Sequence, residues 1–196
     1  MTVTFTVADH IARVTIDRPE ALNAVNTATE AELRRIWDEI ETRKDIRVVV
    51  LTGAGDRAFC AGADLKDVGK EGVAYWADNR PGGFGGLSLR TTLDVPVIAR
   101  VNGHALGGGF EMVLGCDIVI ASENATFGLP EPRVGRLPLD GGMVLLQRQI
   151  PHRAAMGLLL TGRRIAAAEA LRLGIVNEVV PAAELDAAVA RWLVEI

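Results

Sequence analysis

Three consecutive glycines, Gly107 to Gly109, stand where a helix is expected to begin. Glycine costs about 1 kcal/mol relative to alanine inside a helix, so this run indicates that something must approach the backbone there. The N–H groups of a first helical turn lie at the positive end of the helix dipole and suit a developing oxyanion. We therefore predict that the N–H of Gly108 is an oxyanion donor. The alternative is tight packing of the helix against a strand.

Glu111 lies one helical turn beyond Gly108 and on the same face of the expected helix. Its neighbours are almost all apolar: Phe110, Met112, Val113, Leu114 and Cys116. A carboxylate in such a helix is buried, which is costly unless it is paired, hydrogen-bonded or kept protonated for use. Glu111 is therefore a candidate general acid or base, and the alternative is a glutamate that reaches solvent.

Glu131 stands between Pro130 and Pro132, just past an apolar segment. The two prolines restrict the local backbone and so hold the side chain in one direction. An exposed glutamate in a turn would also explain the residue. Two glutamates at one site, however, can divide the acid and base roles if their pKa values differ. We therefore predict Glu131 as the second carboxyl group of the site.

The loop Phe59 to Lys66, with the sequence FCAGADLK, follows an apolar segment and is expected to lead into a helix at Asp64. Its small residues would let a second backbone donor, the N–H of Ala63, face a ligand. Upstream, Gly53, Gly55 and Ala58 match a dinucleotide-binding pattern. The residues that follow do not continue as a helix, and no strand ending in an acidic residue comes about twenty positions later. A nicotinamide-dependent oxidoreductase is thus the less favoured interpretation.

The elements that must position these residues alternate between strand and helix, which predicts an α/β fold with a parallel or mixed sheet. Paired strands are expected at Val3 to Val7 and Ile11 to Asp17, buried strands at Val48 to Leu51, Val97 to Val101 and Ile118 to Ala121, and a short strand at Asn177 to Val180. A helix is expected from Thr27 to Asp45, with Thr27 and Glu30 as a capping box. Between Lys66 and Arg90 the periodicity is lost, and the segment RPGGFGGL predicts a mobile loop.

Composition narrows the class of protein. A chain of 196 residues, 49% of them hydrophobic, fits one domain that buries its own core. The formal net charge of −4 disfavours nucleic-acid binding. Two isolated cysteines and three scattered histidines predict neither a disulfide framework nor a metal site, and they fit a reducing compartment. No leader or membrane span is recognisable, so we expect a cytoplasmic protein without a membrane partner.

Four segments, FCAGADLK, NGHALGGGFE, FGLPEPRVG and TGRRIAAAEALRLGIVNEVV, resemble the crotonase superfamily in their order and spacing, and specifically its enoyl-CoA hydratases. The resemblance covers nearly the whole chain. It implies one acyl-CoA-binding catalytic domain, residues 1–196, with a crotonase-like ββα superhelix and a helical C-terminal region beginning near residue 151. It further implies an oxyanion hole formed by the N–H groups of Ala63 and Gly108, and catalysis by Glu111 and Glu131.

By the same resemblance, the substrate and its CoA moiety contact Ala61, Ala63, Asp64, Leu65, Lys66 and Gly108, with Lys66 as a phosphate partner. The implied enzyme is a carbon–oxygen lyase that adds water reversibly across the C2=C3 bond of an enoyl-CoA thioester. CoA enters as part of the substrate, so no separate cofactor is expected. The family assembles as homotrimers or dimers of trimers and carries a further C-terminal helical segment, which this sequence does not include. The alternatives are an isomerase or hydrolase of the same fold, and a catalytically silent scaffold.

Within the family, PGGFGGL, GGGFE and TGRR most resemble the carnitinyl-CoA dehydratases. The segment GRLPLDGG places Arg136, Leu139 and Asp140 beside the expected acyl pocket. Three aromatic residues, Tyr75, Trp76 and Phe84, lie in the glycine-rich loop. They either anchor that loop on the domain or a neighbouring subunit, or at least one of them faces the pocket and receives a quaternary ammonium group on its ring.

Overall fold

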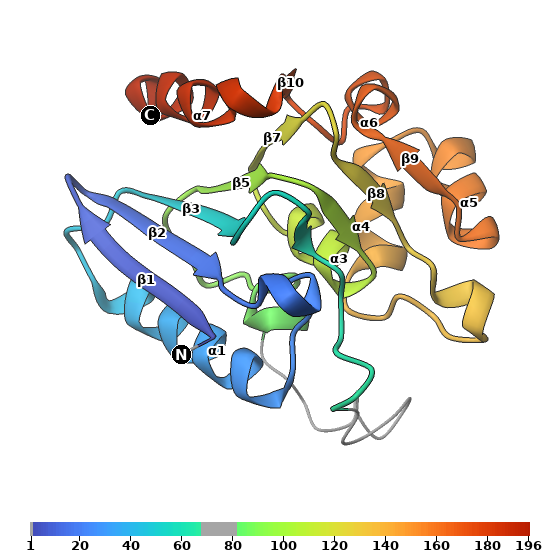
Figure 1. Cartoon of the computed structure of the whole chain (residues 1–196), viewed down its shortest axis with the longest axis horizontal. Coiled ribbons are helices and arrows are strands. Elements are labelled where there is room, and N and C mark those ends of the chain that lie inside the picture. The colour runs from blue at the N-terminus through green and yellow to red at the C-terminus, as the bar shows by residue number, and fades with distance from the viewer. Residues whose placement is uncertain (1, 68–81) are drawn as a thin grey trace.

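The computed structural model describes residues 2–67 and 82–196, and it combines two sheets with surrounding helices (Figure 1). In these residues the larger sheet has six strands in the order β1-β2-β3-β5-β7-β10, and only β1 and β2 pair antiparallel. Its strands are β1 Val3–Ala8, β2 Ile11–Ile16, β3 Val48–Gly53, β5 Val97–Val101, β7 Ile118–Ser122 and β10 Glu178–Val180. The smaller sheet, in the order β4-β6-β8-β9, has β4 Ala58–Cys60, β6 His104–Leu106, β8 Thr126–Gly128 and β9 Arg164–Ala166.

Helices cover both faces of the larger sheet, which explains why its central strands are continuously apolar. Val49 and Leu51 of β3 belong to the main core, whereas Val48 and Val50 pack in a second cluster with residues of α7. In Figure 1, α1 lies on one side of this sheet and α7 on the other. The α-helices are α1 Thr27–Thr42, α3 Gly108–Leu114, α4 Gly142–Gln149, α5 His152–Thr161, α6 Ala167–Leu173 and α7 Leu185–Glu195. The 3-10 helices are η1 Pro19–Ala21, η2 Phe84–Gly86, η3 Glu131–Val134 and η4 Ala182–Glu184.

The expected strands, and the helices expected at Thr27 and near Gly108, are confirmed, with small shifts of their ends and one wrong cap. The α1 helix ends at Thr42 rather than Asp45, and its N-cap is Asn26 rather than Thr27. The Asn26 side chain accepts hydrogen bonds from the backbone N–H (2.8 Å) and the hydroxyl (2.7 Å) of Thr29. Asn26, rather than the predicted Thr27, therefore caps the N-terminus of α1. Asparagine in extended backbone is as good an N-cap residue as threonine.

Three other local predictions need correction. No helix opens at Asp64, where the chain instead makes a turn up to residue 67. Residues 82–87, expected to belong to a mobile loop, are packed: Phe84 in η2 is 5% exposed, and the indole N–H of Trp37 donates to the carbonyl oxygen of Gly85 at 2.9 Å. The second half of the glycine-rich segment is thus part of the core. Helical structure also begins before residue 151, because α4 starts at Gly142.

Within the described residues, no helix is long and apolar enough to cross a membrane.

Candidate active site

The triple glycine forms the N-terminus of α3, as predicted. Gly107 is the N-cap with φ 55°, a left-handed value that favours glycine. Its N–H donates to the carbonyl oxygen of Gly128 at 2.9 Å, and its own carbonyl accepts from Phe110 and Glu111 at 2.9 and 3.0 Å. Gly108 is the first helical residue, whose N–H has no intrahelical acceptor. Among residues 2–67 and 82–196 no other acceptor uses it either, so it is available to a ligand.

Tight packing also explains two of the three glycines. The packing interpretation and the donor interpretation of this run are therefore compatible. A Cβ at Gly108 would lie 2.5 Å from the ring of Phe84, and one at Gly109 would lie 2.1 Å from the carbonyl oxygen of Cys60. The absent side chains let α3 approach η2 and β4, while the N–H of Gly108 keeps its donor capacity. Phe84 therefore supports the wall of the site as an anchor of its loop. Tyr75 and Trp76 lie outside the described residues.

Ala63 directly follows Gly62, which lies close to Gly108. Val25 and Ala63 form a parallel bridge in which the N–H of Val25 donates to Gly62 O at 2.8 Å and the N–H of Asp64 donates to Val25 O at 2.9 Å. In this pattern the N–H of Ala63 itself points away from Val25. No acceptor in the described part of the chain engages it. A Cβ at Gly62 would lie 3.4 Å from the backbone nitrogen of Gly108, so the two donor segments touch.

Glu111 is buried, with 3% of the residue exposed, so the solvent-facing alternative is wrong. The N–H of Gly142, at the start of α4, donates to its Oε1 at 2.9 Å. Burial raises the pKa of Glu111 to about 8, and the nearby charges of Asp140 and Glu131 add to the rise. Because that hydrogen bond only partly offsets the burial, Glu111 holds a proton near neutral pH.

Glu131 begins η3 and directs its carboxyl group toward the N-terminus of α3. Its Oε1 would lie 2.9 Å from a Cβ at Gly107, a contact that only glycine leaves free. Its Oε2 is buried and has no hydrogen-bond partner among the described residues. Burial, followed by the charge of Asp140, raises the pKa of Glu131 above its usual value. An exposed turn glutamate would show none of these features, so Glu131 belongs to the same site as Glu111.

The segment after Glu131 runs close to the two glutamates. Asp140 is near enough to raise the pKa of both glutamates. The backbone N–H of Arg136 donates to the carbonyl oxygen of Glu131 at 2.9 Å, and Leu139 is 38% exposed. Asp140 therefore lies near the two carboxyl groups, while the position of Arg136 and Leu139 relative to an acyl pocket stays a prediction. Gly142 was missed as a hydrogen-bond donor, although the glycine pair before an apolar stretch resembles the start of α3 and could have indicated another helix N-terminus.

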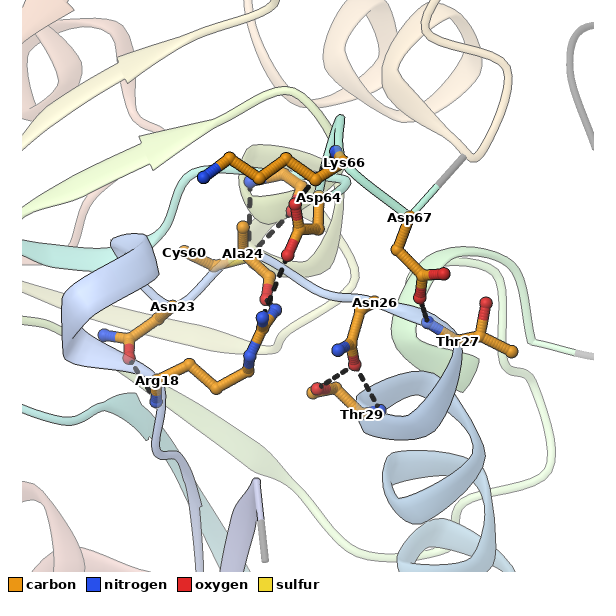
Figure 2. A network of polar contacts seen from close by, with 11 residues as sticks. Arg18, Asn23, Ala24, Asn26, Thr27, Thr29, Cys60, Asp64, Lys66 and Asp67 are labelled. Atoms are coloured by element: carbon orange, nitrogen blue, oxygen red, sulfur yellow. Dashed lines mark hydrogen bonds and ion pairs between the residues drawn. The ribbon is translucent and has the colours of Figure 1, made fainter. Parts of the chain in front are cut away.

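The loop expected to contact CoA is firmly attached to the segment before α1 (Figure 2). The N–H of Ala61 donates to Leu22 O at 3.1 Å, while Leu65 is 77% exposed and Lys66 is also exposed. Asp64 differs from its neighbours because its carboxylate binds the protein itself. It accepts from Arg18 at 2.9 Å and from the backbone N–H of Lys66 at 3.1 Å. These bonds hold its pKa below the usual value, with the Lys66 N–H contributing most.

The remaining candidate chemistry finds little support in the described residues. The glycines of the dinucleotide-like pattern form a turn that leads into strand β4 rather than into a helix. The Asn102 side chain holds this turn by donating to the carbonyl oxygens of Gly53, Gly55 and Ala58 at 2.9, 2.8 and 3.1 Å. Across residues 2–67 and 82–196, no three His, Cys, Asp or Glu side chains are grouped as metal ligands. Cys60 is buried, and burial raises its pKa to about 12, which disfavours a thiolate nucleophile.

Comparisons with known proteins identify what the chain is similar to. A family described as enoyl-CoA hydratase/isomerase matches residues 6–196. The (E)-benzylidenesuccinyl-CoA hydratase of Thauera aromatica is 44% identical over 96% of this chain and 73% of its own length. The carnitinyl-CoA dehydratase of Escherichia coli (strain K12) is 46% identical over 89% of this chain, and the match spans 66% of that protein. The crystal structure of carnitinyl-CoA hydratase from Mycobacterium avium has a TM-score of 0.90 at 40% identity, covering 100% of this chain and 74% of that one.

Proposed function

The chain belongs to the enoyl-CoA hydratase/isomerase family, and from this premise we propose that it adds water reversibly across the C2=C3 bond of an enoyl-CoA thioester. One observation carries the proposal. Two neighbouring carboxyl groups with raised pKa values, Glu111 and Glu131, lie at the N-terminal turn of α3, which carries the donor Gly108 and touches the segment of Ala63. A hydratase needs such a pair to handle one water molecule, together with donors for the thioester oxygen.

The two N–H groups stabilise the negative charge that develops on the thioester oxygen when the C2=C3 bond is attacked. Gly108 adds the positive end of the α3 dipole, and its donor is fixed before substrate arrives. Loss of one such donor costs ~10²–10³-fold in kcat in other enzymes. Ala63 and Gly108 therefore act on the enolate, and neither needs a side chain to do so.

The two glutamates act as one unit that carries one proton. The ionised carboxylate takes a proton from water as the water oxygen bonds to C3, and the protonated carboxyl gives its proton to C2. The pair then again holds one proton, so hydration and dehydration are the same path in opposite directions. The buried Oε2 of Glu131, which has no partner in the described part of the chain, supplies an acceptor, and the raised pKa of Glu111 supplies a retained proton.

Substrate binding uses the exposed part of the loop from Ala61 to Lys66, with the ammonium group of Lys66 near the CoA phosphates. Asp64 contributes through its backbone, because its carboxylate is engaged by Arg18. CoA is part of the substrate, and the proposed reaction transfers no electrons and requires no metal. We also propose that the chain assembles as a homotrimer or a dimer of trimers, which light scattering of the purified protein would measure.

A panel of enoyl-CoA thioesters tests the reaction through the loss of conjugated absorbance. The panel contains crotonyl-CoA, crotonobetainyl-CoA and (E)-benzylidenesuccinyl-CoA, the last two chosen from the names of the relatives. Product analysis distinguishes hydration from isomerisation and thioester hydrolysis. We expect Glu111→Gln and Glu131→Gln each to lower kcat by at least ~10²-fold, and the double variant to be little worse than either one. The exposed Glu123→Gln is the matched control. Near-normal turnover by either single variant would remove that glutamate from the mechanism.

A further inference from the structure

We propose that Arg18 is a positioning residue for catalysis, because its ion pair with Asp64 fixes the backbone that carries the oxyanion donor Ala63. This inference rests on the proposed function, since it assumes that Ala63 binds the thioester oxygen. It gives Asp64 a structural partner within the protein and identifies Arg18 as a residue on which the reaction depends.

The Arg18 guanidinium joins the two chain segments that meet at Ala63 (Figure 2). One of its terminal nitrogens donates to Asp64 Oδ2 at 2.9 Å, and the other donates to the carbonyl oxygen of Ala24 at 2.6 Å. Asp64 directly follows Ala63, and Ala24 directly precedes Val25, the bridge partner of Ala63. Arg18 therefore braces both sides of the bridge that orients the donor N–H.

The position of Arg18 is itself fixed by its backbone. Its N–H donates to the side-chain oxygen of Asn23 at 3.0 Å, and its carbonyl accepts from the N–H of Asn23 at 2.9 Å. Asn23 is fully buried and has φ 56°, and its amide also donates to the carbonyls of Ala54 and Ala58. The guanidinium thus extends from a rigid turn at the end of β2, and it can transmit that rigidity to the loop.

Burial makes this ion pair more than a surface contact. The side chains of Arg18 and Asp64 are only 15% and 14% exposed. Exposed ion pairs add little because water screens them, whereas removing one partner of a shielded pair leaves the other charge poorly solvated. Asp64 would then turn toward water, and such a rotation moves the neighbouring peptide of Ala63. A displacement of about 1 Å at a catalytic group can cost ~10²-fold in rate.

Kinetics and spectroscopy of an Arg18→Gln variant test the proposal. We expect kcat for the best substrate of the panel to fall by ~10- to 100-fold, while KM changes by less than ~3-fold. This split is expected because the donor acts chiefly on the transition state. A second readout is the absorption maximum of bound cinnamoyl-CoA, recorded in the Glu111→Gln background so that turnover does not consume the chromophore. The red shift caused by carbonyl polarisation should be smaller when Arg18→Gln is added.

Four further variants keep the test decisive. Arg18→Lys retains the positive charge and should recover part of kcat, which covers the case in which Arg18→Gln does not fold. Asp64→Asn should also lower kcat. The double variant Arg18→Gln/Asp64→Asn should have a kcat no lower than that of the more impaired single variant. Arg100→Gln breaks a partly buried ion pair of similar length, 2.6 Å to Asp186, on the α7 side of the sheet and should leave kcat unchanged.

An active wild type whose Arg18→Gln and Asp64→Asn variants fold and keep full kcat and the full red shift would overturn the role of Arg18 alone. A folded wild type that hydrates no member of the panel would instead contradict the proposed function. Equal losses of kcat in Arg18→Gln and Arg100→Gln would reduce Arg18 to a general contributor to stability and would also overturn the proposal.

Discussion

Replacing Glu111 by glutamine should remove a pH-dependent cost from the stability of the protein. Burial raises the pKa of Glu111 from 4.5 to about 8, so the folded state holds this proton long after the unfolded chain would release it. Between these two values, the free energy of unfolding of the wild type therefore falls as the pH rises. Glutamine does not titrate, and its side-chain oxygen can still accept the N–H of Gly142.

The size of the effect follows from the pKa difference. At ~1.36 kcal/mol per pKa unit, a rise from 4.5 to about 8 corresponds to about 4 to 5 kcal/mol across the titration. Below pH 4.5 both states carry the proton, and the variant and the wild type should then be similarly stable, since glutamine resembles a protonated glutamate. Above pH 8 the variant should be more stable by most of that amount. In this range folding of the wild type requires Glu111 either to be buried as a charged carboxylate or to take up a proton that the unfolded chain has released.

Urea unfolding followed by circular dichroism, at one-unit intervals from pH 5 to pH 9, measures this difference. Protein concentration and ionic strength are held constant, because association and screening also change apparent stability. The exposed Glu123→Gln should follow the wild-type curve throughout. If the curves of Glu111→Gln and wild type run parallel from pH 5 to pH 9, the buried and protonated state of Glu111 is refuted.

The other predictions concern the rate and the local packing. The pH profile of kcat/KM should fall on the alkaline side with an apparent pKa of about 8, as the glutamate pair loses its shared proton; a plateau through pH 9.5 would contradict this. Gly108→Ala should lower the free energy of unfolding by about 1–3 kcal/mol, because its methyl group meets the Phe84 ring, and a Phe84→Ala partner should make the two costs non-additive in urea unfolding. Asn26→Ala should cost about 1 kcal/mol in the same assay through loss of the α1 cap, and an unchanged midpoint would show that Thr29 needs no such partner.

Much of the fold could be predicted because its strands and helices carry strong local patterns. The run Val48 to Leu51 is apolar on both faces, and the structure explains this by the two clusters that α1 and α7 help to form. Ends and caps were harder, since both Asn26 and Thr27 are acceptable N-cap residues and only the backbone conformation decides between them. The packed turn at Phe84 was missed because its glycines indicate freedom, whereas here they allow close approach to α1 and α3.

The carboxyl groups and the donors could be proposed from sequence because residues of their types are unfavourable in their local surroundings. A glutamate within an apolar helix and three glycines at a helix start both need a reason. Sequence could not decide between packing and chemistry at the glycines. The structure shows the packing and leaves the proposed donor without an acceptor among the described residues. Neighbouring atoms occupy the Cβ positions of Gly108 and Gly109, and no acceptor in the described part of the chain engages the N–H of Gly108.

Arg18 illustrates what a linear reading cannot supply. Forty-six residues separate it from Asp64, and the sequence shows two opposite charges with nothing to mark them as partners. The resemblance to the enoyl-CoA hydratases implied that the loop containing Asp64 contacts CoA. In the structure the Asp64 side chain is only 14% exposed, and its carboxylate forms an ion pair with Arg18. This carboxylate therefore binds the protein itself. Positioning residues of this kind can therefore be found by looking for a buried ion pair next to a backbone donor. Such a pair is visible in the structure but not in the sequence.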